Sequence, residues 1–563
     1  EALLFTSGAT TRLGRIEDGN TVSDFSSEEI SRKISISTSL LNTNYNSVKL
    51  NILDTPGFND FIGEVKCGLK VADTAFMLIN SSEGVEVGTE IIWKNALKDN
   101  IPFVFVVNKL DHENSDFQKC IDSLKNKFGS DVVVTQFPAN PKVGFDSIID
   151  IIKMKLIKYE SNASGKYTEL DIPANFQEQA KKLREELIEK VAESDEELMN
   201  IFFENGGLSD EEFDKGLATG LLNRKIYPVF CTSATKNIGL ATILEFIEKY
   251  CPSPDKRSPV KVQKLNSDQF INLDINSNGE PVLFIFKTVN EKNIGEMAFF
   301  KVMSGKVSAG LDLQNTSTGK AERLSQISMI NGKDRKEILE AIAGDLAAVV
   351  KLKDTHSNNT LCSKNLSVIV PPIEFPEPVI SLALIPKAKG DEDKISSGLH
   401  KIHEEDPTFV FKVDPELGQT IISGQGELHL NIIVKRFKER YGVDVDIVEP
   451  KIPYRETIKG KVDDAEYKHK KQSGGRGQYG HVHLKIEPLP RGGGFQFEDA
   501  VVGGVVPGRF IPAVEKGIVE TMEKGVIAGY KIVDVKVTIF DGTHHPVDSD
   551  EMSFKIAGAQ AFK

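Results

Sequence analysis

A five-residue turn of the sequence, DTPGF at positions 54–58, has groups suited to phosphate and metal chemistry. It ends the apolar run Val48–Asp54, which predicts a strand. The carboxylate of Asp54 can hold Mg²⁺ through water, and the amide of Gly57 can approach a γ-phosphate because no Cβ obstructs it. Asp, Pro and Gly are also ordinary turn formers, so a plain turn is an equally good interpretation of this segment alone.

Two further loops have the chemistry to recognise a base. NKLD, at 108–111, directly follows the apolar run FVFVV, and a carboxylate at Asp111 can accept from the ring N–H and the exocyclic NH₂ of guanine. Adenine has no 2-amino group, so this loop favours guanine, although a solvated loop is the alternative. TSAT, at 232–235, follows another apolar run, and its backbone can contact the guanine O6. The predicted GTP-binding residues are Asp54, Thr55, Pro56, Gly57, Phe58, Asn108, Lys109, Leu110, Asp111, Ser233 and Ala234.

The elements that must position these loops are apolar strands alternating with helices. Four runs, VKLNILD, AFMLINS, IPFVFVVN and IYPVFCTSA, are separated by helical patterns such as GTEIIWKNALKDN. This alternation indicates a parallel sheet covered on both faces. Ligands bind at the carboxyl ends of such strands, so the three loops are expected at one edge of the sheet.

Composition excludes several classes of protein. The 563 residues carry a net charge of −13, which argues against coating by nucleic acid, although local patches can still bind RNA. The five cysteines lie far apart without zinc spacing, as expected for reduced thiols. No apolar run reaches the ~18 residues that span a bilayer, and no signal peptide is visible. A cytoplasmic monomer without a membrane partner is expected.

The remaining chain predicts three more domains. Residues 275–370 are short strands with Gly turns, typical of a small β-barrel. Residues 379–450 follow the order βαββαβ, which is ferredoxin-like and by itself implies no function. We expect domains at 1–255, with a helical insert at about 156–225, and at 256–372, 373–455 and 456–563.

The last predicted domain contains a basic, glycine-rich segment, KHKKQSGGRGQYGHVH at 468–483. Cations attract phosphates and glycines allow close approach to RNA, whereas a flexible basic hairpin is the alternative. A second loop, DGTHHPVDSDE, brings His544 and His545; adjacent side chains on extended backbone point to opposite sides, so they are not expected to share a metal. The predicted RNA-contacting residues are Lys470, Lys471, Ser473, Gly474, Gly475, Arg476, Gly477, Gln478 and His545.

These motifs in this order resemble translational GTPases. SGGRGQYGHV, DGTHHPVDSDEMSFKIAG and GQGELHL resemble bacterial elongation factor G closely, along the whole chain. The resemblance implies a multidomain α/β and α+β protein with a P-loop-type GTPase domain, a β-barrel, a ferredoxin-like domain and an α+β tip domain. It implies GTP and Mg²⁺ as ligands, with Ser35 of RKISIS and Asp54 at the metal.

The resemblance also implies the ribosome as partner. The tip, with His545, would lie in the decoding region beside rRNA, tRNA and mRNA. The acidic helical insert would meet the ribosomal stalk protein, although a solvated helix surface is the alternative. The family's phosphate loop and fifth domain are not among the 563 residues. We expect the first before Glu1 and the second after Lys563, and expect these residues alone to bind nucleotide poorly.

Phe58 departs from the family pattern D-T-P-G-H, whose histidine orients the attacking water. A phenyl ring makes no useful hydrogen bond to that water, and losing such a group costs ~10²–10⁴-fold in rate. Two hypotheses follow. The protein is a GTP-driven translocase with slow hydrolysis, or it is a ribosome-binding factor in recycling, stress or resistance that uses GTP as a conformational ligand with little turnover. A GTP-binding protein unrelated to ribosomes is opposed by the tip loops.

Overall fold

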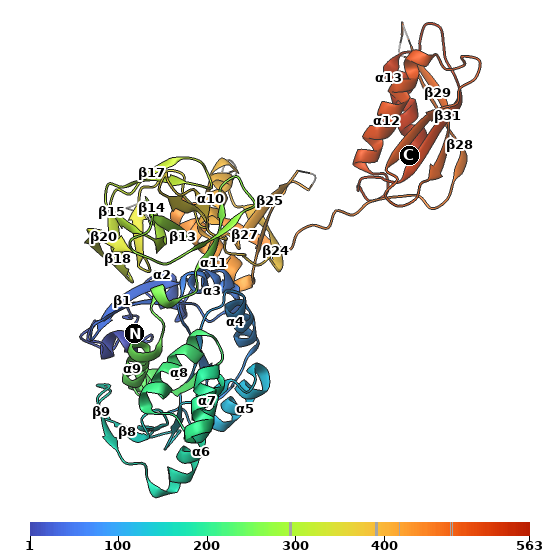
Figure 1. The fold of residues 1–563 in the computed structure, drawn as a ribbon. Helices are drawn as coiled ribbons and strands as arrows, with labels where there is room; N and C mark the ends of the chain where they lie inside the picture. The colour runs from blue at the N-terminus through green and yellow to red at the C-terminus, as the bar shows by residue number, and fades with distance from the viewer. Residues whose placement is uncertain (292–294, 389–391, 416, 473, 476) are drawn as a thin grey trace. The chain divides into compact units, whose positions relative to one another are not determined.

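The computed structural model describes residues 1–291, 295–388, 392–415, 417–472, 474–475 and 477–563. They form two compact units (Figure 1). The first comprises Glu1–Asp414 and Gln419–Glu449, and the second comprises Pro415–Gly418 and Pro450–Lys563. Among these residues, none of the helices combines the length and apolar character that a bilayer-spanning segment requires.

A parallel sheet with the strand order β3-β4-β10-β5 forms the base of the first unit. Its central strands, β4 and β10, are buried along almost their whole length, which confirms that both faces are covered. The strands are β3 (Ala75–Asn80), β4 (Phe103–Asn108), β5 (Val132–Val134) and β10 (Tyr227–Cys231). Helices of this region are α1 (Ala2–Thr6), α2 (Ser27–Arg32), α3 (Ile62–Val71), α4 (Val87–Lys98), α5 (Phe117–Phe128) and α9 (Leu240–Tyr250), with the 3₁₀ turns η1 (Asn59–Phe61), η2 (Ala234–Lys236) and η3 (Pro254–Lys256).

The strand before the DTPGF turn does not hydrogen-bond to this sheet. β2 (Val48–Asp54) pairs antiparallel with β1 (Ser39–Tyr45) in a separate two-stranded sheet. The expectation that all four apolar runs share one parallel sheet is therefore wrong for VKLNILD. The reason is local: Asn46 has a φ of 49° and closes a two-residue turn, so the two adjacent segments form a hairpin.

The segment expected to be a helical insert begins as strands. An antiparallel sheet with the order β6-β7-β8-β9 precedes the helices, so the expectation of helix from residue 156 is corrected to a start at Ala174. The strand Lys155–Tyr159 alternates between buried and exposed positions near its end, which is a period of two. The elements are β6 (Gln136–Pro138), β7 (Ser147–Asp150), β8 (Lys155–Tyr159), β9 (Tyr167–Leu170), α6 (Ala174–Glu193), α7 (Glu196–Asn205) and α8 (Asp210–Leu222).

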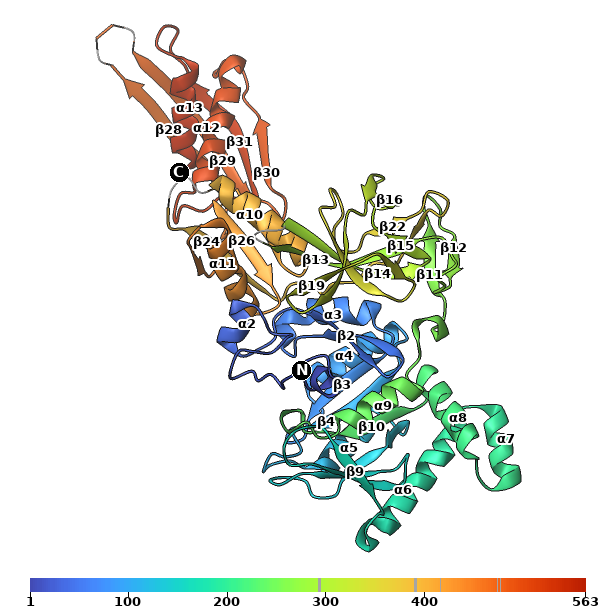
Figure 2. The same ribbon diagram turned by 90° about the vertical axis from the view of Figure 1, so that its left-hand side faces the viewer.

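The three helices pack beside one another (Figure 2). In α6, Leu187 and Val191 are buried and Leu183 packs partly against the core. The acidic side chains that are solvent-exposed along α6 and α7 are Glu178, Glu185, Glu189, Glu193, Glu196, Glu197 and Glu204.

The barrel domain is an antiparallel sheet with the order β17-β16-β22-β13-β14-β21-β18-β19, and separate hydrophobic clusters pack around it. Its strands are β13 (Val282–Glu291), β14 (Gly295–Ser304), β16 (Asp312–Asn315), β17 (Ala321–Arg323), β18 (Ile327–Asn331), β19 (Asp334–Ile338), β21 (Leu346–Val350) and β22 (Thr360–Cys362). Two further sheets, β12-β11-β23 and β15-β20, contain the strands β11 (Val260–Lys264), β12 (Phe270–Leu273), β15 (Lys306–Ser308), β20 (Glu340–Ile342) and β23 (Val368–Ile369).

The third domain confirms the predicted βαββαβ order. Its antiparallel sheet runs β25-β26-β24-β27, which is the ferredoxin-like arrangement. The elements are β24 (Ile380–Pro386), α10 (Glu392–Glu405), β25 (Val410–Asp414), β26 (Gln419–Gly424), α11 (Glu427–Tyr441) and β27 (Val445–Val448).

The second unit is a four-stranded sheet, β28-β29-β31-β30, with two helices on one face (Figure 1). Its core joins Val482 and Leu484 of β29 to Val514 of α12 and Phe554 of α13. The elements are β28 (Val462–Lys471), β29 (Gln478–Pro488), β30 (Phe495–Asp499), η4 (Gly508–Phe510), α12 (Ile511–Lys524), β31 (Val535–Thr543) and α13 (Glu551–Phe562).

Candidate nucleotide-binding and switch site

The two base-recognition loops lie together because their strands are neighbours. β4 and β10 pair in parallel, and the amide of Thr232 donates to Val107 O at 2.8 Å where the strands end. The side-chain oxygen of Asn108 then accepts from the amide of Ala234 at 3.0 Å and from the hydroxyl of Thr232 at 3.1 Å. Asn108 is thus the bridge that holds NKLD against TSAT.

The carboxylate of Asp111 is oriented by the same pair of loops. The hydroxyl of Ser233 donates to Asp111 Oδ1 at 2.7 Å, and the carboxylate is half-buried. Lys109 has a φ of 62°, and its carbonyl accepts from the hydroxyl of Ser81 at 2.8 Å. A carboxylate held in this way can present its lone pairs to two adjacent N–H groups of a guanine edge.

The DTPGF turn follows β2, and its residues Gly57 and Phe58 are exposed to solvent. A Cβ at Gly57 would meet no atom within 4 Å among the described residues, so packing within the chain does not demand glycine here. Phe58 is 50 % exposed and joins none of the hydrophobic clusters of the described residues. Its carbonyl accepts from the amide of Phe61 at 3.0 Å as η1 begins. The phenyl ring therefore lies at the site without a packing role.

An oxygen-rich group links Ser35 to Asp54 through Asp24, a residue that sequence reasoning missed. The hydroxyl of Ser35 hydrogen-bonds to the carboxylate of Asp24, which is 8 % exposed. Burial raises the pKa of Asp24, the Ser35 hydrogen bond opposes that rise, and the carboxylates of Glu29 and Asp54 add to it. A hydroxyl and clustered carboxylates are ligands that suit Mg²⁺, and a divalent cation would relieve this repulsion, so the residues present fit the ion.

Glu29 anchors the backbone that follows Ser35. It is 2 % exposed and completes a capping box with Ser26 at the start of α2. The same carboxylate accepts from the amides of Ile36 and Ser37, at 3.0 and 3.1 Å. The S-x-x-E spacing is a sequence signal for the cap, but nothing in the sequence indicates its second role.

The segment around Ser35 and the segment that begins with the DTPGF turn, called the switch segments below, contact the third domain directly. Ile36, Phe61 of η1 and Ile432 of α11 form a small buried cluster. Asp60, next to Phe61, accepts the amide of His429 in the first turn of α11, at 3.2 Å from Oδ2. A carboxylate at this position caps the helix from another domain. The sequence motif GQGELHL marks this helix start, but only the fold shows what caps it.

Behind this cap lies a buried His–Asp pair. His429 Nε2 is 2.8 Å from Asp406 Oδ2, and Phe61 packs edge-on against the His429 ring. Burial alone would raise the pKa of Asp406, but hydrogen bonds and charge from His429, together with hydrogen bonds from Thr408, outweigh it and lower the pKa to about 2. The first turn of α11, which Asp60 caps, is therefore also held by the contacts of His429 with Asp406 and Phe61.

Replacing Gly426 with Ala should break the hydrogen bond between Asp60 and the amide of His429. The new Cβ would lie 2.1 Å from Asp60 Oδ2, so the Asp60 side chain must rotate away and lose the His429 amide. We expect the unfolding free energy of the first unit to fall by ~0.5–2 kcal/mol, with faster hydrogen exchange at the His429 amide.

Gly207→Ala is the matched control, because a Cβ there meets no described atom within 4 Å. In an Asp60→Ala background, Gly426→Ala should cost little more, since the cap is already absent. Equal costs of Gly426→Ala in both backgrounds would contradict a cap by Asp60.

The barrel is joined to the switch region by two buried lysines. Lys287 Nζ lies 2.6 Å from Glu64 and donates to Thr38 O at 3.1 Å, while the amide of Thr38 donates to the same Glu64 carboxylate. Lys301 Nζ contacts Asp73 at 2.7 Å. Removing one partner of such a buried pair is costly, so the barrel position is coupled to the segment that follows Ser35.

The predicted RNA-contacting loops are joined in the second unit. The side chains of Lys470 and Lys471 are exposed at the end of β28. The amide of Gly477 donates to Asp548 Oδ1 at 2.9 Å, which ties the glycine-rich loop to the histidine loop. Gln478 pairs with Lys471 in the hairpin. Gly474 and Gly475 have φ values of 74° and 83°, which favour glycine, and the predicted Ser473 and Arg476 lie outside the described residues.

The two adjacent histidines contact different partners. His544 Nδ1 lies 3.1 Å from Val505 O, whereas His545 Nδ1 accepts from the amide of Asp548 at 3.1 Å. His545 is exposed, and its ring lies 6.3 Å from that of Tyr479. The two adjacent side chains therefore make separate contacts.

The fold and site define a multidomain GTP-binding switch protein. Four family models match in order: Elongation factor Tu GTP binding domain at 1–253, Elongation factor G domain 2 at 281–364, Elongation Factor G domain III at 375–449, and Elongation factor G domain IV at 450–563. The chain is 40 % identical over 565 residues to Elongation factor G of Thermotoga sp. (strain RQ2), covering 100 % of this chain and 81 % of the relative.

Elongation factor G of Thermotoga maritima is also 40 % identical, with 82 % of its length covered. A crystal structure from Thermus thermophilus superposes with a TM-score of 0.83 at 32 % identity, covering 100 % of this chain and 81 % of that one. The chain belongs to the elongation factor G family of translational GTPases.

Proposed function

We propose that this protein binds the ribosome and promotes movement of tRNA and mRNA, using GTP that it hydrolyses slowly. The observation that carries this proposal is the contact of both switch segments with α11, through the Ile36–Phe61–Ile432 cluster and the Asp60 cap. A ligand that reorders either switch would change these contacts. The state of the nucleotide is then transmitted to the third domain as a change of packing.

Different residues of the site would recognise the base and bind the phosphates. Asn108, Asp111 and Ser233 select guanine, whereas Asp54, Gly57 and Ser35 face the phosphates and the ion. Mg²⁺, when bound, would neutralise charge on the phosphate oxygens. Phe58 cannot orient the attacking water, so binding is kept while hydrolysis is slow.

The second unit supplies the surface for RNA. Exposed Lys470 and Lys471 lie beside glycines that permit close backbone approach, and His545 is on the adjoining loop. This loop pair is suited to contact rRNA, tRNA or mRNA through phosphates. The exposed acidic face of α6 and α7 is suited to a different partner, and the ribosomal stalk protein is the candidate.

A test of the function measures two things on the same ribosomes: phosphate release and movement of mRNA by one codon. Movement that depends on GTP, with phosphate release slower than movement, is the expected result. No effect on movement with tight GTP-dependent ribosome binding would favour the second candidate function, a factor that uses GTP as a conformational ligand in recycling, stress or resistance. Phe58 is the observation that favours that candidate.

Removing the tip cations should weaken ribosome binding in a salt-dependent way. In Lys470→Ala/Lys471→Ala, two exposed positive charges are lost. Each lost phosphate contact should lower the slope of log affinity against log salt by about 0.7–0.9. Binding measured over a series of salt concentrations reports that slope.

The control removes two exposed lysines elsewhere in the same unit, Lys459→Ala/Lys516→Ala. Its slope should stay close to the wild-type value. A tip variant that keeps the wild-type slope would show that these lysines do not contact RNA.

A further inference from the structure

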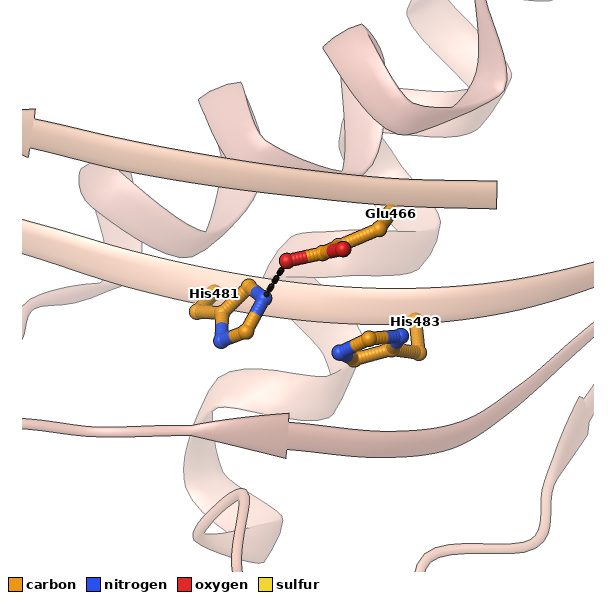
Figure 3. A group of neighbouring side chains, drawn as sticks. All are labelled: Glu466, His481 and His483. Carbon is orange, nitrogen blue, oxygen red and sulfur yellow. Dashed lines mark hydrogen bonds and ion pairs between the residues drawn. The ribbon is translucent and has the colours of Figure 1, made fainter. Parts of the chain in front are cut away.

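A cluster of metal-ligating side chains lies in the second unit, apart from the nucleotide site and from the residues predicted to contact RNA. Glu466 is on β28, and His481 and His483 are on β29; one ligand atom from each lies within 4.8 Å of the others (Figure 3). The antiparallel register pairs Glu466 with His483. His481 and His483 are two residues apart on a strand, so both rings project from one face.

That face is the one opposite the helices. Val482 and Leu484 alternate with the histidines and belong to the core with α12 and α13. The two rings are neighbours, with centroids 4.8 Å apart. Burial differs within the group: the side chains of His481 and His483 are 10 % and 19 % exposed, whereas Glu466 is 55 % exposed.

Each histidine is oriented through one nitrogen by a neighbouring oxygen. His481 Nδ1 lies 3.0 Å from the hydroxyl of Thr543 on β31, and His483 Nδ1 lies 2.8 Å from Asp464 Oδ1. Hydrogen bonds of this kind set the tautomer and aim the other nitrogen, which is how protein metal sites prepare histidine ligands. The Nε2 of His481 is directed at Glu466 Oε1, 2.8 Å away.

The donor set selects the class of ion. Two imidazoles and one carboxylate suit Zn²⁺, Co²⁺ or Ni²⁺, whereas Mg²⁺ and Ca²⁺ prefer oxygen ligands only. Tetrahedral Zn²⁺ with bonds of about 2.0–2.2 Å needs ligand atoms about 3.4 Å apart. The His481–Glu466 pair, at 2.8 Å, must therefore move slightly apart, and any pair near the 4.8 Å limit must move closer. The exposed Glu466 can make that movement by rotating its side chain, while His481, the least exposed of the three, stays in place.

Ordinary hydrogen bonding accounts for part of this arrangement. The Glu466–His481 and Asp464–His483 pairs would each form without a metal. In addition to these pairs, the strand register and the two-residue spacing of the histidines bring one ligand atom of each of the three side chains within 4.8 Å of the others.

We propose that Glu466, His481 and His483 bind one divalent transition cation, of which Zn²⁺ fits best, with the fourth position open to water. The ion would join β28 to β29 a few residues before the Lys471–Gln478 pair that closes the hairpin. It would thereby stiffen the base of the loop that carries the exposed lysines. This proposal is independent of nucleotide binding and of hydrolysis.

The test titrates the full chain, freed of metal with a chelator, with Zn²⁺ by calorimetry and with Co²⁺ by visible absorption. We expect one ion per chain and a tetrahedral Co²⁺ spectrum. Glu466→Gln and His483→Gln should each weaken Zn²⁺ binding by more than about 10-fold, and Asp464→Asn, which only orients His483, by about 10-fold. Glu466 is exposed, so its variant should fold normally.

His544→Gln is the matched control, since it removes an exposed histidine of the same unit that is outside the group. It should bind Zn²⁺ as the wild type does. Wild-type protein that binds no Zn²⁺ at millimolar concentration would overturn the site. Equal affinity of the wild type, Glu466→Gln and His483→Gln would overturn it too, because the ion would then be held elsewhere.

Discussion

Phe58→His in the full-length protein should raise ribosome-stimulated GTP hydrolysis by up to ~10²–10⁴-fold. An imidazole at this position can accept from or donate to the attacking water, which a phenyl ring cannot. The ring of Phe58 is half-exposed and supports no hydrophobic cluster among the described residues, so the substitution should cost little stability. GTP affinity should change little, because Asn108, Asp111 and Asp54 are unchanged.

A single-turnover assay at saturating ribosome concentration measures the chemical step without nucleotide exchange. Phe58→Leu is the control, since it removes the ring without adding a hydrogen-bonding group, and its rate should match the wild type. Fast hydrolysis by the wild type with no gain in Phe58→His would show that another group positions the water. A gain in Phe58→Leu equal to that in Phe58→His would instead identify the bulk of the ring as the obstacle.

Asp111→Asn should weaken GTP binding by ~10²–10⁴-fold. The hydrogen bond from the exocyclic amino group of guanine is lost, the one from the ring N–H no longer has a charged acceptor, and each such bond contributes ~1.5–3 kcal/mol. The amide nitrogen of asparagine then faces the amino group of guanine, so two donors oppose each other. Xanthosine triphosphate, which has a carbonyl at position 2, should become the preferred nucleotide. Equilibrium binding of the three nucleotides GTP, ATP and XTP to the full-length protein gives the specificity ratios.

Asp122→Asn, on the exposed side of the adjacent helix α5, is the control and should keep the preference for GTP. Equal affinity of the wild type for ATP and GTP would contradict the assignment of Asp111 to guanine recognition. So would an Asp111→Asn variant that keeps its preference for GTP over XTP.

Local sequence patterns predicted much of the fold because they depend on periodicity. Fully buried strands such as Phe103–Asn108 and Tyr227–Cys231 are continuous apolar runs, and the segment 379–450 alternates strand and helix patterns clearly. The errors arose where pairing is decided by neighbours. Val48–Asp54 has an apolar pattern but forms a hairpin with Ser39–Tyr45. The strands Lys155–Tyr159 and Tyr167–Leu170 are each too short for their periodicity to be recognised.

The sequence by itself determined the chemical groups: the D-x-x-G turn with Phe58, the guanine-type loop ending in Asp111, and the basic loop with Lys470 and Lys471. Only the tertiary structure decided which groups act together. Three contacts join segments that sequence spacing does not bring together. Asp24 contacts Ser35, Asp60 caps α11, and Glu466 faces His481 and His483. Such contacts depend on how helices and strands pack, and packing is set by many weak interactions distributed over the whole unit.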